Sequence, residues 1–277
     1  MKISDTLYVS DLDGTLLGPD ARLLPDTIEI INLLLSEGML FTFATARSYV
    51  TARVVTQELK LTLPMITYTG VFLCDPVTGA PIEKYLPERA RIERTLHDIE
   101  ENHAPAIVYS LVDGAERLSW VDQTENAAMR EYLGSRNNDK RLRPVIGYDE
   151  LFAGEIFYIT MMGELPMMRR VADRAEADGH LRAIFQRDTY GSRNWWLELF
   201  SAHAGKDAAA QKVRAISGAR RLVSFGDNIN DLSMFSVSDE CYAVKNAHPD
   251  VKAAATGVIG GNDEDGVARW LEANIFR

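Results

Sequence analysis

The chain has 277 residues, of which 46% are hydrophobic and 25% are charged, and its formal net charge is −10. These values are typical of a soluble globular protein that forms one large domain or a core with an insertion. The acidic balance argues against a protein that binds nucleic acid or an anionic membrane, because such proteins contact their partners through basic surfaces.

The first 74 residues alternate between apolar runs typical of buried strands and segments typical of helices. We expect strands at Leu7–Ser10, Met39–Ala44 and Met65–Tyr68. One helix is expected from Pro25 up to a stop at Gly38, and another over Ser48–Leu61. Strands separated by helices form right-handed βαβ units, so this part of the chain predicts a parallel sheet.

The alternation of strands and helices stops after Gly70, where short apolar runs are separated by Asp-Pro, Thr-Gly and Asp-Gly pairs typical of turns. Two hairpins are expected here, and the second turns at Asp113-Gly114. Helices and strands follow over 88–102, 125–133, 156–161, 167–177, 183–186 and 195–200, with a polar loop at 135–143. Hairpins mixed with helices predict an α+β unit with an antiparallel sheet.

The alternation of helices and strands typical of a parallel sheet resumes at Gly205. A helix over Lys206–Ile216 leads to a strand at Leu222–Phe225, and a further strand is expected at Cys241–Val244. Other helices are expected after Asn230, from Pro249 and around Val267–Leu271. The sequence therefore predicts an α/β fold with a Rossmann-like parallel-sheet core, residues 1–74 and 194–277, interrupted by an inserted α+β unit at 75–193.

Polar side chains gather where the core strands end, which is where open α/β sheets bind their ligands. Asp11 and Asp13 follow the first strand, and the segment 45–48 (Thr-Ala-Arg-Ser) follows the second. The fourth core strand leads to 226–231 (Gly-Asp-Asn-Ile-Asn-Asp), and Lys206 stands in the first turn of the helix before that strand. Taken singly, each feature has an ordinary explanation as a turn, a helix cap or a solvated lysine.

Together these features predict a metal site. Four carboxylates would converge on one edge of the sheet, those of Asp11, Asp13, Asp227 and Asp231. Carboxylates that are crowded without a cation repel one another and destabilise the fold. Because oxygen ligands with no histidine or cysteine nearby suit Mg²⁺ better than zinc, we expect a Mg²⁺ site.

Asp11 and Asp13 could divide a phosphoryl-transfer reaction between them. One carboxylate can attack phosphorus while the other, protonated, donates to the leaving oxygen. Thr45 and Lys206 would bind the equatorial oxygens of the phosphoryl group, where negative charge must be offset.

Four segments of the chain resemble, in this order, the motifs of the haloacid dehalogenase (HAD) superfamily: Asp11–Leu16 (DLDGTL), Thr45, Lys206 and 226–231 (GDNIND). The insert resembles the cap domain of the Cof-type subclass IIB, and the resemblance covers essentially the whole chain. It implies a HAD catalytic core with a cap that selects the substrate. It also implies a Mg²⁺-dependent phosphatase that acts on a small phosphorylated metabolite, with sugar phosphates as the leading class.

The resemblance also implies a role for each matching residue. Asp11 would be the nucleophile that forms an aspartyl-phosphate, and Asp13 the general acid that later serves as base for the hydrolytic water. The Mg²⁺ ligands would be Asp11, Asp227 and the backbone carbonyl of Asp13. The phosphate would be bound by Thr45, Ala46, Lys206 and Asn230. Asp231 would contact these binding residues without binding the phosphate or the metal itself.

The chain departs from the family pattern at three positions. Ala46 stands where glycine is usual, Thr69 precedes Gly70 where asparagine is common, and Asp207 follows the lysine where glycine is common. None of these departures changes the nucleophile, the acid or the metal-binding carboxylates.

Three other functions are compatible with these residues. A sugar phosphomutase on the same scaffold would use Asp13 to return the phosphoryl group to a sugar. A receiver-like phospho-accepting switch also combines strand-end aspartates, a threonine and a lysine around Mg²⁺, although the long insert and Asp13 argue against it. A catalytically silent binding protein is the weakest option, because every chemical position is filled.

We expect a cytoplasmic protein that is a monomer or a weak homo-oligomer, with no nucleic-acid or membrane partner. The segment 1–14 lacks the apolar region of a secretory signal, and polar residues break the apolar stretch 28–46. The two cysteines, Cys74 and Cys241, exclude a disulfide framework and a cysteine-based zinc site.

Overall fold

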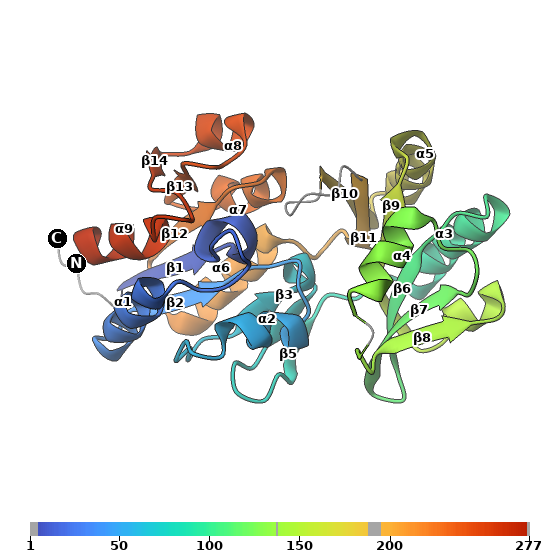
Figure 1. The fold of residues 1–277 in the computed structure, drawn as a ribbon, viewed down its shortest axis with the longest axis horizontal. Coiled ribbons are helices and arrows are strands. Elements are labelled where there is room, and N and C mark those ends of the chain that lie inside the picture. The colour runs from blue at the N-terminus through green and yellow to red at the C-terminus, as the bar shows by residue number, and fades with distance from the viewer. Residues whose placement is uncertain (1–4, 137, 188–194, 276–277) are drawn as a thin grey trace. The chain divides into compact units, whose positions relative to one another are not determined.

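The computed structural model describes residues 5–136, 138–187 and 195–275 and divides the chain into two compact units. The first unit comprises Met1–Lys84 and Ala204–Arg277, and the second is Tyr85–His203 (Figure 1). A core interrupted by an insert is the organisation that the sequence predicts.

The expected boundaries follow residues 74 and 193. The observed boundaries follow Lys84 and His203, later in the chain at both junctions. Strand pairing accounts for the difference. β5 (Pro81–Lys84) pairs with β4 (Phe72–Cys74) of the first unit, and β11 (Trp195–Ser201) pairs with β9 (Glu155–Gly163) of the second. Local periodicity does not reveal these partners, so the expected boundaries are early by one strand at each junction.

A five-stranded parallel sheet forms the centre of the first unit, in the order β14-β13-β12-β1-β2. Its strands are β1 (Thr6–Ser10), β2 (Leu40–Phe43), β12 (Arg221–Gly226), β13 (Glu240–Val244) and β14 (Gly257–Ile259). The helices of this unit are α1 (Pro25–Ser36), α2 (Tyr49–Thr56), α6 (Lys206–Ser217), α7 (Leu232–Ser236), α8 (Pro249–Ala254) and α9 (Gly266–Asn274). Shorter helical turns lie at 12–16, 68–70 and 229–231. The predicted α/β core is confirmed.

The predicted third strand forms, but outside the main sheet. β3 (Met65–Thr67) meets the end of β2 through a single bridge between Ala44 and Ile66. The turn at Tyr68–Gly70 then reverses the chain, so β3 pairs antiparallel with β4 and opens a three-stranded sheet that ends with β5. The expected parallel pairing of the third strand is therefore limited to this one bridge, and the ladder of β3 is formed with the antiparallel β4.

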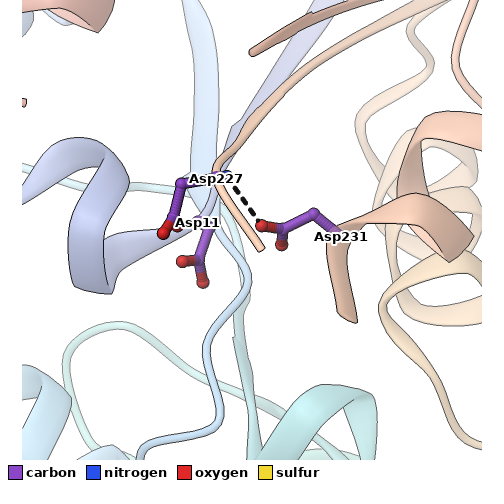
Figure 2. A group of neighbouring side chains, drawn as sticks. All are labelled: Asp11, Asp227 and Asp231. Carbon is purple, nitrogen blue, oxygen red and sulfur yellow. Dashed lines mark hydrogen bonds between the residues drawn. The ribbon is translucent and has the colours of Figure 1, made fainter. Parts of the chain in front are cut away.

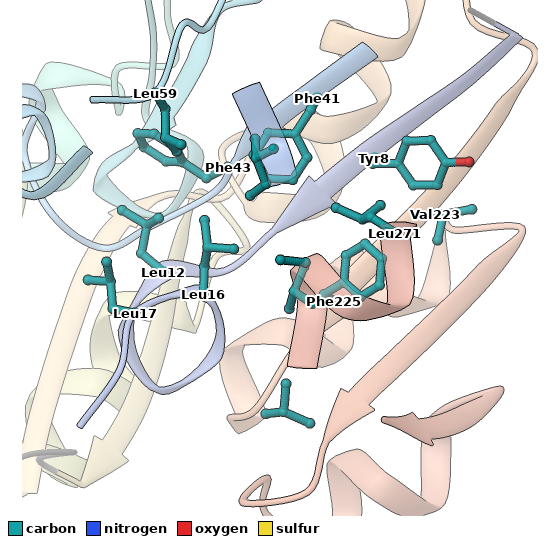
Figure 3. Close-up of a cluster of buried hydrophobic side chains, with 14 of the residues drawn as sticks. Tyr8, Leu12, Leu16, Leu17, Phe41, Phe43, Leu59, Val223, Phe225 and Leu271 are labelled. Carbon is teal, nitrogen blue, oxygen red and sulfur yellow. The ribbon is translucent and has the colours of Figure 1, made fainter. Parts of the chain in front are cut away.

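Side chains of the central strands point alternately to the two faces of the sheet, and helices cover both faces. One face packs on α1, α9 and the 12–16 turn, through a cluster that includes Tyr8, Leu16, Phe41, Phe43, Phe225 and Leu271 (Figure 3). The other face packs on α6, through Leu7, Val9, Leu222, Ala209, Ala210 and Val213. β1 is buried on both faces and lies between β12 and β2, which sets the point where Asp11 emerges.

The second unit contains a six-stranded sheet in the order β10-β11-β9-β6-β7-β8. Its remaining strands are β6 (Ile107–Val112), β7 (Ala115–Val121), β8 (Leu142–Val145) and β10 (Leu181–Arg187). Neighbouring strands are antiparallel except β7 and β8, which are parallel. The predicted α+β insert is thus confirmed.

Helices α3 (Arg89–Glu101) and α5 (Leu165–Glu176) share a hydrophobic cluster with this sheet, while α4 (Ala127–Gly134) and a helical turn at 148–152 lie between strands in the sequence. The hairpin of β6 and β7 turns at Asp113 and Gly114, whose φ angles of 51° and 75° suit a two-residue hairpin turn. The loop expected up to residue 143 ends earlier, because pairing with β7 makes Leu142 the first residue of β8. Within the described ranges, no helix combines the length and apolar character needed to cross a membrane.

Replacing Phe43 with alanine tests the core beneath the sheet edge. Phe43 is fully buried, and the loss of its ring leaves a cavity, so the free energy of unfolding should fall by about 3–5 kcal/mol. Val54→Ala is the control, because Val54 is 66% exposed and should change stability by about 0.5 kcal/mol or less. Urea denaturation measures the free energy of unfolding of both variants. An equal loss in the two would contradict the placement of Phe43 in the core.

Candidate active site

Lys206 is the first residue of α6, and its side chain is fully buried between two carboxylates. Its Nζ donates to Asp11 Oδ1 at 2.6 Å and to Asp231 Oδ1 at 2.7 Å. Burial by itself would lower the pKa of Lys206, but the two carboxylates outweigh it and raise this pKa above its usual value. Since a cation is unfavourable at a helix N-terminus, the two ion pairs are what hold the ammonium group there.

Asp11 and Asp227 emerge from neighbouring strands at the same edge of the sheet. β1 and β12 pair in parallel, and the backbone N–H of Asp11 extends this pairing by donating to the carbonyl of Phe225 at 2.9 Å. Both carboxylates consequently lie beyond the carboxyl ends of the strands (Figure 2). Thr15 Oγ1 donates to Asp227 Oδ1 at 2.8 Å and orients that carboxylate.

Asp231 is oriented by backbone amides. It ends the short helical turn 229–231, and its Oδ2 accepts from the N–H groups of Asp227 at 2.9 Å (Figure 2) and Asn228 at 3.0 Å. Its Oδ1 accepts from Lys206. With hydrogen bonds at both oxygens, Asp231 fixes the loop and the lysine, and it is less suited than Asp11 and Asp227 to bind a metal directly.

The charges of this cluster do not balance without a further cation. Carboxylate oxygens of Asp11, Asp227 and Asp231 lie within 4.8 Å of one another, and the buried Lys206 ammonium contacts two of them, Asp11 and Asp231. Burial is the main cause that raises the pKa of Asp11 well above its usual value, and burial followed by the charge of Asp231 raises the pKa of Asp227 to about 7. A divalent cation that prefers oxygen ligands would stabilise the ionised carboxylates. Asp11 and Asp227 fit such a cation.

The turn at 12–16 approaches Asp227 closely through Gly14. Its φ is +79°, and a Cβ at this position would lie 2.5 Å from Asp227 Oδ2. Only glycine allows both the left-handed backbone and this approach. Asn246, which follows β13, holds the turn in place because its Nδ2 donates to the Gly14 carbonyl at 2.7 Å.

The turn at Tyr68–Gly70 connects the loop after β2 to the start of α6. Tyr68 and Thr69 have φ angles of 49° and 54°, and left-handed backbone is particularly unfavourable for the β-branched Thr69. A Cβ on Gly70 would lie 2.2 Å from the carbonyl oxygen of Gly205, the residue before Lys206. The strained turn therefore sets the position from which Lys206 reaches the carboxylates.

Thr45 and Ala46 follow β2, and the arginine after them reaches the loop that follows β1. Thr45 is buried, Ala46 is partly buried, and Thr45 Oγ1 accepts from the N–H of Arg47 at 3.1 Å. The Arg47 guanidinium donates to Asp13 through Nε at 2.8 Å and through Nη2 at 2.5 Å. This bidentate pair joins the two loops that flank the cluster. The remaining predicted residue, Asn230, lies on the 229–231 turn beside Asp231 and is partly buried.

The structure thus brings Asp11, Lys206, Asp227 and Asp231 into one group, whereas Asp13, the fourth carboxylate expected there, lies outside this group and pairs with Arg47. Three further residues shape this group although no role is expected of them from the sequence: Thr15, Arg47 and Asn246. Thr15 and Arg47 stand in the strand-end segments 11–16 and 45–48 named above, and Asn246 follows the strand expected at 241–244. What each contacts could not be read from the sequence.

Known proteins resemble this chain over nearly its whole length. The family model described as haloacid dehalogenase-like hydrolase matches residues 8–271. The chain is similar to the 5-amino-6-(5-phospho-D-ribitylamino)uracil phosphatase YitU of Bacillus subtilis, with 25% identity over 98% of each chain. It is also similar to the pyridoxal phosphate phosphatase YbhA of Escherichia coli, with 24% identity over 96% of this chain and 97% of that one.

The fold is similar to that of a solved structure described as the HAD subclass IIB sugar phosphatase BT4131. The TM-score is 0.77 with 19% identity, over 97% of this chain and 98% of that one. The core and its inserted unit therefore have the fold of this subclass, which confirms the predicted fold.

Addition of a divalent cation tests the carboxylate group. A cation bound to the folded state at about a hundred times its dissociation constant stabilises it by roughly 2.7 kcal/mol, so Mg²⁺ or Mn²⁺ should raise the melting temperature by several degrees. Asp227→Asn should lose this increment, because one ligand oxygen and one charge are removed. Asp173→Asn, an exposed carboxylate on α5, should retain it. An equal cation effect in all three proteins would refute the site.

Proposed function

This chain belongs to the haloacid dehalogenase-like hydrolases, and we propose that it is a Mg²⁺-dependent phosphatase that hydrolyses a small phosphorylated metabolite. The observation that carries the proposal is the buried group in which Lys206 holds Asp11 and Asp231, with Asp227 adding a further carboxylate. The names of the similar proteins support it, because they describe phosphatases of small phosphorylated compounds.

Asp11 supplies the nucleophile. Its carboxylate attacks the phosphorus of the ester, the bond between phosphorus and the leaving oxygen breaks, and Asp13 gives a proton to that oxygen. The phosphoryl group is then an acyl phosphate on Asp11. In the second half of the reaction Asp13 takes a proton from water, whose oxygen attacks phosphorus, so that inorganic phosphate leaves and the Asp11 carboxylate returns.

The other residues of the group bind and orient the phosphoryl group. We assign its oxygens to Lys206, Thr45, Asn230 and the backbone N–H of Ala46. Asp11, Asp227 and the backbone carbonyl of Asp13 would hold Mg²⁺, which would supply positive charge to offset the negative charge of these oxygens. Asp231 keeps Lys206 in place through the 2.7 Å contact.

Sugar phosphates are the substrate class that we favour, because the similar solved structure is described as a sugar phosphatase. The second unit, Tyr85–His203, would act as the cap that selects the leaving group. Hydrolysis is favoured over a phosphomutase or a receiver-like switch, because the similar proteins are named as phosphatases.

Asp11→Asn should abolish hydrolysis of a generic aryl phosphate in the presence of Mg²⁺. Removal of the nucleophile lowers kcat by at least about a thousandfold, while the isosteric amide leaves the fold intact by circular dichroism. Asp20→Asn is the control, because Asp20 is exposed and should leave the rate unchanged. Wild-type rates in Asp11→Asn would show that the mechanism is wrong.

A panel of phosphorylated metabolites, assayed with Mg²⁺ and with EDTA, tests the substrate class. We expect phosphate release that depends on Mg²⁺, with a higher kcat/KM for a sugar phosphate than for pyridoxal phosphate. Isomer formation without phosphate release would point instead to a phosphomutase. A stable phosphoprotein without turnover would point to a receiver-like switch.

A further inference from the structure

We propose that Asn246 and Asn262 are positioning residues that hold the Asp227 carboxylate in the orientation in which it would bind Mg²⁺. They act through the turn at 12–16, which contacts that carboxylate. The inference rests on the proposed function, in which Asp227 is a metal ligand. It gives a role to the loops after β13 and β14, which carry none of the proposed catalytic or binding residues.

The turn at 12–16 contacts Asp227 through two neighbouring residues. Thr15 Oγ1 donates to Asp227 Oδ1 at 2.8 Å. A Cβ on Gly14 would lie 2.5 Å from Asp227 Oδ2, so the backbone at Gly14 lies directly against the other oxygen. A shift of the turn would therefore displace the groups that face both oxygens of this carboxylate.

This turn lacks the backbone angles of a regular helix. Asp13 and Gly14 have φ/ψ angles of −74°/119° and 79°/−5°, and a bond from the N–H of Leu17 to the carbonyl of Leu12 closes the turn at 2.8 Å. The side chains of Leu12, Leu16 and Leu17 pack in the core and hold the apolar side of the turn. Its carbonyl oxygens are held by side chains from other loops.

The two asparagines supply these contacts. Asn246 Nδ2 donates to the Gly14 carbonyl at 2.7 Å, and Asn262 Nδ2 donates to the Leu17 carbonyl at 2.8 Å. The asparagines are also joined to each other, because the N–H of Asn262 donates to Asn246 Oδ1 at 3.1 Å. Both the nitrogen and the oxygen of the Asn246 amide therefore have a partner, which fixes the plane of the amide and the direction of its donor.

The segment that carries Asn246 also contacts the backbone of Asp227. The N–H of His248 donates to the Asp227 carbonyl at 2.8 Å. In the sheet, β12 lies between β13 and β1, so the contact from Asn246 to Gly14 spans the strand end from which Asp227 emerges. Residues 246–248 thus fix the backbone of Asp227 directly and its carboxylate through the turn.

The orientation of Asp227 matters because Mg²⁺ accepts little deviation from octahedral geometry. Residues that orient a metal ligand without touching the metal typically change metal affinity by about ten- to a hundredfold. A purely structural residue would instead lower the stability of the protein with and without the metal and leave the affinity unchanged. The dissociation constant of Mg²⁺ therefore distinguishes the two roles.

The experiment measures binding of MgCl₂ to the full chain by isothermal titration calorimetry. Asn246→Ala should raise the dissociation constant by about tenfold. Asn262→Ala should raise it by less, because the backbone N–H of this residue remains. The metal-free Asn246→Ala protein should melt close to wild type, since Asn246 is exposed and water can replace its hydrogen bonds.

Asn32→Ala is the matched control. Asn32 lies on α1 and makes the same pair of bonds: its Nδ2 donates to the Glu58 carbonyl at 2.9 Å, and its Oδ1 accepts from the N–H of Lys60 at 2.9 Å. Both partners belong to the loop after α2, so this variant should bind Mg²⁺ with wild-type affinity. A dissociation constant that rises equally in Asn32→Ala and Asn246→Ala, or in neither, would overturn the proposal.

A double-mutant cycle with Thr15→Val tests the route through the turn. Thr15→Val removes the hydroxyl that orients Asp227 and should itself weaken Mg²⁺ binding. If Asn246 acts through the same turn, adding Asn246→Ala to Thr15→Val should raise the dissociation constant by less than about threefold, because coupled residues do not contribute independently. Two losses that multiply in full would show that Asn246 acts by another route and would refute the inference.

Asp227→Asn separates failure of this inference from failure of the proposed function. Weaker Mg²⁺ binding in Asp227→Asn together with wild-type binding in Asn246→Ala would refute the role of the asparagines alone. If Asp227→Asn binds Mg²⁺ as wild type does, the proposed metal site fails and the inference fails with it.

Discussion

The contacts of the Lys206 ammonium with Asp11 and Asp231 are the interaction on which the site depends. All three side chains are buried, and a buried charge is tolerated only when it is paired and hydrogen-bonded. The lysine comes from the start of α6, and the two aspartates follow β1 and β12. β1 is thereby joined to α6 and β12, which lie far from it in the sequence, and a change to any of these charges would affect the other two.

The backbone prepares this arrangement before any ligand binds. Amides of Asp227 and Asn228 orient Asp231, the glycine at position 14 lets the first loop approach Asp227, and the left-handed turn at Tyr68–Gly70 fixes the start of α6. Catalysis of phosphoryl transfer consists mainly of positioning and electrostatic stabilisation. Strain and close backbone contacts at this edge of the sheet serve that purpose, because they leave few alternative positions for the charged groups.

The first unit is complete only when the chain returns from the insert. β1 and β2 precede the insert, whereas α6 and β12–β14 follow it, and the central pairing of β1 with β12 joins the two parts. Lys206, Asp227 and Asp231 all belong to the later part. The carboxylate of Asp11 therefore acquires its partners through long-range contacts, whose formation requires closure of a long loop.

The sequence by itself determined the strands and helices of the core, the presence of an α+β insert and the carboxylates that follow the strands, because apolar periodicity and short motifs are local properties. It did not determine that β3 leaves the main sheet, that β5 and β11 move the unit boundaries, or that Arg47 binds Asp13. Each of these depends on pairing between segments that are distant in the chain or on left-handed backbone at Tyr68 and Thr69. Only the tertiary structure decides them, because strand partners and side-chain contacts are selected by packing, and local sequence does not specify which partner is met.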